Sequence, residues 1–166
     1  MNNISNEEIL GIQKIFSKIN SIFITLVAVM VLFLLFTLYL VSKVPMQDAF
    51  TPGMQITFKI LMAVYTLLVL ISGMLTYKRR IQSIPKNIQL IDKVEYYRKT
   101  ITIKLIGTGG AILFTFAVLL LTSDYLILIL SGLLFIILFM QIPGKKQFSK
   151  DFALSENELE ALGRQR

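Results

Sequence analysis

The stretch Ser21–Ser42, SIFITLVAVMVLFLLFTLYLVS, holds 22 residues without a single charge. At a helical rise of about 1.5 Å per residue, a run of this length spans about 33 Å, close to the ~30 Å thickness of a bilayer hydrocarbon core. No polar face recurs in it with the period of 3.6 residues that a surface helix of a soluble protein shows. The run therefore predicts a transmembrane helix.

Three further uncharged runs have the same character, at residues 60–77, 105–123 and 125–142. The mean hydropathy of the chain is +0.70 and only 16% of its residues are charged, whereas soluble globular chains carry about 25%. We therefore expect an all-α integral membrane protein. Its four transmembrane helices should span residues 21–42, 60–77, 105–123 and 125–142, arranged as two antiparallel hairpins.

Two segments outside these runs have an amphipathic pattern. In residues 1–20, apolar side chains recur at helical spacing while Lys14 and Lys18 occupy other faces. The basic loop 78–104 repeats this pattern after Pro85. We expect an amphipathic cytoplasmic helix before the first and the third span, the first of them (residues 1–20) lying at the membrane interface. The remaining residues, 143–166, should form a cytoplasmic tail with a short helix.

The distribution of positive charge predicts the orientation. Four spans place the N-terminus, the loop 78–104 and the C-terminus on one side, which then carries fifteen Lys and Arg residues. The other side carries two, Lys43 and Lys59. Short loops rich in Lys and Arg remain cytoplasmic. We therefore expect a multi-pass protein of the cell (cytoplasmic or inner) membrane with both termini inside.

The basic residues of the middle loop are candidates for contact with anionic lipid or with a partner. A basic residue near an anionic membrane surface contributes about 1 kcal/mol of attraction. Nucleic-acid binding is disfavoured, because the positive-inside bias alone predicts such a cluster. The candidate contact residues are Lys78, Arg79, Arg80, Lys86, Lys93, Arg98 and Lys99.

Small residues inside the apolar runs are candidates for helix packing, because they let two helix backbones approach closely. We expect them to pack within the monomer; a seam between copies in a homo-oligomer is the alternative. The candidates are Gly107, Gly110 and Ala111 in the third run, Ser72 and Gly73 in the second, and Ser131 and Gly132 in the fourth.

Residues suited to catalysis are scarce. The chain has no Cys and no His, which excludes disulfides, thiolate nucleophiles, Cys/His zinc sites and imidazole bases. No acidic, basic or amide side chain lies deep in any run, although such groups mark proton and substrate paths in membrane proteins. Asp48 and Asp124 fall in different loops of the other side. We expect no enzyme activity, no cofactor and no metal site.

The tail from Phe148 to Arg166 has apolar side chains that a solvated end would not need. We expect it to dock on a partner or back onto the basic middle loop, with a frayed terminus as the alternative.

The composition as a whole favours a non-enzymatic membrane protein that acts through protein or lipid contacts, such as an accessory subunit, an immunity-type protector or a regulator. The alternative is a small oligomeric channel or transporter, with the spans of several copies lining the path.

Overall fold

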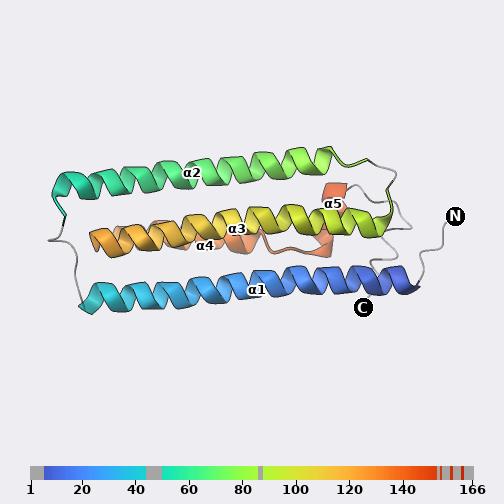
Figure 1. Cartoon of the computed structure of the whole chain (residues 1–166), viewed down its shortest axis with the longest axis horizontal. Coiled ribbons are helices and arrows are strands. Elements are labelled where there is room, and N and C mark those ends of the chain that lie inside the picture. The colour runs from blue at the N-terminus through green and yellow to red at the C-terminus, as the bar shows by residue number, and fades with distance from the viewer. Residues whose placement is uncertain are drawn as a thin grey trace.

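The computed structural model describes residues 6–43, 50–85, 88–152, 154, 158 and 162 of the chain. Helices are the only regular structure in these residues, which confirms the all-α prediction for them (Figure 1). They are α1 (Asn6–Lys43), α2 (Pro52–Gln82), α3 (Leu90–Thr122), α4 (Leu126–Met140) and α5 (Lys145–Phe152).

Three of these helices, α1, α2 and α3, are long and apolar enough to cross a membrane. The helix α4 has 15 residues, or about 22 Å, and qualifies only when it is counted together with α5, from which it is bent by 72°. The run expected to be helical through residue 142 ends at Met140, shortly before Pro143. Proline lacks a backbone N–H and disfavours the helical conformation of the residue before it, which explains the early end of α4.

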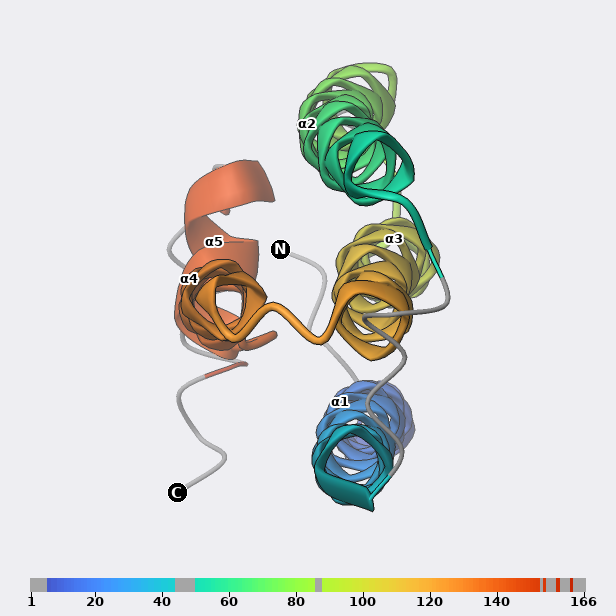
Figure 2. The ribbon, with the colours of Figure 1, turned by 90° about the vertical axis from the view of Figure 1, so that its left-hand side faces the viewer.

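The helix α3 lies at the centre of the bundle. Viewed along the axis, α1 and α2 lie on opposite sides of α3, and α4 packs against a third side of it (Figure 2). Because α1 and α2 pack on α3, the expected layout of four spans as two antiparallel hairpins is not confirmed. Over half of the most apolar part of α3 is buried (56%), against 17% in α1 and 11% in α2, so α3 supplies most of the core.

The amphipathic segments expected as separate helices are continuous with the spans that follow them. The helix α1 runs unbroken through residues 20 and 21, and α3 runs unbroken from Leu90 into the third apolar run. The reason lies in their apolar faces. Ile12 and Ile19 of α1 belong to the same buried cluster as Val94 and Tyr97 of α3. Each segment thus buries an apolar face against the other instead of laying it on a membrane surface.

The connection between α3 and α4 is short and requires an unusual backbone conformation. Ser123 follows the last residue of α3 with a φ of 50°, in the left-handed region, and its N–H donates to the Leu119 carbonyl. This conformation reverses the chain within three residues, so α4 runs antiparallel to α3 and packs on it. Ser123 is the only non-glycine residue with positive φ in the described part of the chain.

Candidate functional site

Charged and aromatic side chains gather at one end of the bundle. We call it the basic end: α1 begins there, α2 ends there, α3 begins there, and α5 lies there (Figure 1). The candidate contact residues Lys78, Arg79 and Arg80 are exposed on the last turns of α2, and Lys99 is exposed on α3. Lys86 lies outside the described residues. These four exposed cations make the basic end electropositive.

The other two candidate cations, Lys93 and Arg98, are paired within the chain. Lys93 is 8% exposed, and its Nζ lies 2.6 Å from Oε1 of Glu158 in the tail. Arg98 donates to Glu95, one helical turn earlier. Lys93 therefore holds the tail against α3 and is not presented to lipid.

The tail docks on the bundle through an aromatic cluster. Phe148 of α5 is fully buried (0% exposed). Its ring lies 5.3 Å from that of Tyr97 on α3 and 5.8 Å from that of Phe16 on α1, measured between centroids. Lys145 Nζ also donates to the carbonyl of Leu162, 3.3 Å away. Through Tyr97 the tail packs on the basic segment 78–104, as one of the two expected docking modes has it, and through Phe16 it also packs on α1, which was not expected.

A polar cluster joins α2, α3 and α5 beside these rings. Tyr77, near the end of α2, donates a hydrogen bond to Oδ2 of Asp151 on α5. Lys104 of α3 places its Nζ 4.8 Å from the centroid of the Tyr77 ring, a cation–π contact. Lys104 forms no ion pair within 4.0 Å among the residues that the structure describes. Its charge thus faces an aromatic ring, with a carboxylate close by.

A cavity of about 340 Å³ begins at Lys104 and extends between α2, α3 and α4. Two other polar residues line it, Thr108 and Gln141, which are hydrogen-bonded to each other at 3.2 Å. The rest of the lining is apolar: Val69, Leu70, Gly73 and Met74 from α2, and Ile137 and Met140 from α4. A volume in this range is typical of small-ligand pockets. The cavity has a cationic end and an apolar body.

The small residues of α3 differ in how closely they meet other helices. A Cβ added to Gly107 would lie 3.5 Å from Val69 of α2, and one added to Gly110 would lie 3.9 Å from the Tyr65 hydroxyl. Both are ordinary van der Waals distances. Ala111 is fully buried.

Among the glycines of α3, the closest approach to another helix is at Gly109, which is not one of the residues predicted from the sequence. A Cβ there would lie 3.0 Å from Met30 Cε and 3.1 Å from Leu26 Cδ1, both on α1. The small-xxx-small spacing predicts close approach of another helix at Gly107 and Ala111. The neighbouring glycine points toward α1, the helix against which α3 packs most extensively.

The small residues of α2 and α4 divide into one that is packed and three that are not. Ser131 is buried, and its Oγ lies 2.9 Å from Oγ1 of Thr115 on α3. Ser72 and Gly132 are exposed. A Cβ added to Gly73 or Gly132 would meet nothing within 4 Å. Ser131 therefore links α3 and α4, whereas Gly73 borders the cavity.

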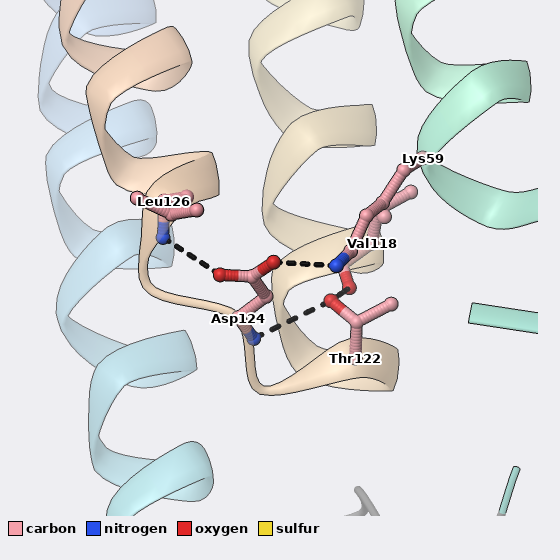
Figure 3. Close-up of polar contacts among 5 residues, drawn as sticks. All are labelled: Lys59, Val118, Thr122, Asp124 and Leu126. Atoms are coloured by element: carbon pink, nitrogen blue, oxygen red, sulfur yellow. Dashed lines mark hydrogen bonds and ion pairs between the residues drawn. The ribbon is translucent and has the colours of Figure 1, made fainter. Parts of the chain in front are cut away.

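At the opposite end of the bundle, an ion pair between two described residues links α2 to the turn between α3 and α4. Asp124, in the turn between α3 and α4, lies 2.5 Å from Lys59 of α2 and accepts a hydrogen bond from the Leu126 N–H at 3.0 Å (Figure 3). The hydrogen bond from Lys59 is the main cause that lowers the pKa of Asp124 below its ordinary value, and the Leu126 N–H acts in the same direction. Of the two acids expected at this end, Asp48 and Asp124, only Asp124 lies among the described residues.

No group of three or more metal-ligating side chains occurs among the described residues. Comparison with protein-family models, with characterised proteins and with solved structures gives no match to this chain. Its function is therefore inferred from its own residues.

Proposed function

We propose that this chain is a multi-pass protein of the cell membrane that carries no catalytic site. It works through contacts with anionic lipid and with another membrane protein or a further copy of itself. In this proposal the basic end and both termini are cytoplasmic, because fifteen positive charges belong to that side and two to the other. The fourth span consists of α4 and the two residues that follow it.

The outer face of α2 is the observation that best supports a contact role. Leu61, Leu68, Ile71 and Leu75 are each at least half exposed. They recur at intervals of three, four or seven residues, so they share one face of the helix. Soluble monomers rarely expose a contiguous apolar surface of this kind. In a membrane it meets lipid or another helix.

Ser72 lies on this outer part of α2 and favours a protein partner over lipid alone. Its hydroxyl donates to the Val69 carbonyl of its own helix at 3.1 Å, and its side chain is exposed. Small hydroxyl residues at such positions let a second helix approach closely. The residue therefore supports helix-to-helix contact at α2.

The test is purification in mild detergent, with mass measurement of the complex and identification of whatever copurifies. We expect a stoichiometric membrane-protein partner, or a second copy, that is lost on Ser72→Leu. Thr57→Leu is the matched control, because Thr57 is also exposed on α2 and also bonds its own helix, at the Gly53 carbonyl. A ring of identical subunits around a water-filled pore would contradict the contact role and support a channel.

A further inference from the structure

The cavity between α2, α3 and α4 is open at its side as well as polar at one end. Met74 of α2 and Met140 of α4 line it and are 59% and 80% exposed. Both methionines therefore also form part of the outer surface of the bundle. In Figure 2, α2 and α4 lie apart, each against a different side of α3. The cavity thus opens laterally between α2 and α4, on a surface that lipid covers in the proposed membrane orientation.

The lining changes from polar to apolar along the helix axis. Lys104, Thr108 and Gln141 form the polar part. Lys104 is the last charged residue before the uncharged run of α3, so in the proposed orientation its ammonium lies at the level of the lipid headgroups. Val69 and Leu70 are about one helical turn nearer the middle of α2 than Met74. The apolar part of the cavity therefore points into the bilayer.

The polar end of the cavity presents one cation, Lys104, to which a negative group can bind. Lys104 has an aromatic face as its neighbour and no ion pair within 4.0 Å among the described residues. The Asp151 carboxylate accepts a hydrogen bond from the Tyr77 hydroxyl and attracts the Lys104 ammonium without forming an ion pair with it. Thr108 has one hydroxyl proton and two acceptors within reach, the Lys104 carbonyl at 3.1 Å and Oε1 of Gln141 at 3.2 Å, so Thr108 and Gln141 together keep hydrogen-bonding capacity beside Lys104. One cation beside two polar side chains at the mouth of an apolar cavity fits a phosphate attached to an acyl chain.

We propose that the cavity binds one anionic phospholipid, with an acyl chain between α2 and α4 and the phosphate on Lys104. The proposal rests on the membrane-spanning orientation given above. It differs from a general attraction of basic residues to a membrane surface, because it names one lipid, one cavity and one cation. A lipid bound there would fill the space that the three helices leave open and would link α2 to α4.

The acyl-chain part is tested by filling the cavity. Gly73 borders the cavity and a Cβ there meets nothing within 4 Å, so the side chain of Gly73→Leu begins in open space at the cavity. Gly132→Leu is the matched control, because Gly132 is equally open but lies outside the cavity. The readout is native mass spectrometry of the full-length protein in detergent with added dioleoyl-phosphatidylglycerol. Gly73→Leu should weaken retention of the single bound lipid about tenfold or more, and Gly132→Leu should retain it as the wild type does.

The headgroup part is tested by removing the charge. Lys104→Gln should lower the preference for dioleoyl-phosphatidylglycerol over dioleoyl-phosphatidylcholine about fivefold. Lys43→Gln, which removes an exposed charge from the last turn of α1 at the opposite end of the bundle, should leave the preference unchanged. Equal retention by Gly73→Leu and the wild type, or an unchanged preference in Lys104→Gln, would overturn the proposal.

Membrane insertion is measured separately for each variant by resistance to extraction with alkaline carbonate. If the wild type is extracted, the membrane-spanning role itself fails. If all variants insert and none loses the lipid, the lipid site alone fails. Retention of inorganic phosphate without lipid, or of oleate with an affinity that Lys104→Gln does not alter, would also contradict a phospholipid site.

Discussion

Lys93 of α3 and Glu158 of the tail, 65 residues apart in the chain, meet with 2.6 Å between Nζ and Oε1. Both side chains are largely buried, with 10% and 17% of their surfaces exposed. Removal of one partner from such a pair leaves the other charge in a poorly solvated place. The contact thus makes docking of the tail depend on a charge in the first turn of α3.

Lys93→Met should release the tail, because Glu158 would lose its cation while remaining close to apolar side chains. We expect the free energy of unfolding to fall by about 2 kcal/mol, below the full cost of breaking a completely buried pair. The measurement is SDS titration in mixed micelles, with limited proteolysis of residues 153–166 as a second readout. The charge exchange Lys93→Glu with Glu158→Lys should recover part of the loss; no recovery would show that the pair itself is not the cause.

Phe148→Ala should destabilise the basic end more than any exposed aromatic substitution. The Phe148 ring is completely buried between α1 and α3, and truncation of a buried Phe costs about 3–5 kcal/mol. Phe33→Ala is the control, since Phe33 is half exposed on α1. Equal unfolding midpoints for the two variants in SDS titration would contradict the packing of α5 described here.

Gly109→Ala should destabilise the bundle, whereas Gly110→Ala should be tolerated. A methyl group at 109 meets Met30 and Leu26 at 3.0 and 3.1 Å, while one at 110 has 3.9 Å to its nearest neighbour. The neighbours at 109 are ends of flexible side chains, so the expected cost lies near the lower end of the overpacking range, about 1 kcal/mol. Thermal unfolding in detergent measures the difference. A larger loss of stability in Gly110→Ala than in Gly109→Ala would contradict the packing of α1 on the face of α3 that contains Gly109.

The ion pair between Lys59 and Asp124 predicts a dependence of stability on pH. The folded pKa of Asp124 is lower than its unfolded value, which is about 3.9. The pair therefore stabilises the fold above that pH, and its contribution is lost as the pH falls through the folded pKa. Both side chains are partly exposed, so the contribution is on the order of 0.5 kcal/mol.

Asp124→Asn isolates this effect, because the amide oxygen can still accept from the Leu126 N–H. The wild type should be the more stable protein at pH 6, and the difference should shrink as the pH falls below about 4. The same difference should decrease in high salt. A difference that stays constant between pH 6 and pH 3 would show that the carboxylate does not act through its charge.

The positions of the long helices could be predicted from the sequence, because uncharged apolar runs of this length rarely form anything other than a long helix. The arrangement of the helices could not. Each run is apolar on every side, so its periodicity does not indicate which face is buried. The central place of α3 depends on contacts such as Gly109 with Met30, which no local pattern contains.

The continuity of α1 and α3 was mispredicted for a related reason. An apolar stripe opposite lysines fits a helix on a membrane surface and equally fits a helix covered by another part of the same chain. Ile12 and Val94 are buried in one cluster, a relationship between residues far apart in sequence. The cavity at Lys104 was also not predicted. In the sequence Lys104 is one of many positive charges, and the space arises only where three helices meet.

Labelling of single cysteines tests the central claim, a membrane-spanning bundle with its basic end in the cytoplasm, most directly. The chain contains no Cys, so Ser83→Cys and Tyr125→Cys each introduce one thiol, at exposed positions of opposite ends. A membrane-impermeant maleimide should label Tyr125→Cys in intact spheroplasts and Ser83→Cys only after lysis. Labelling of Ser83→Cys in intact spheroplasts, or equal labelling of both before lysis, would contradict the account.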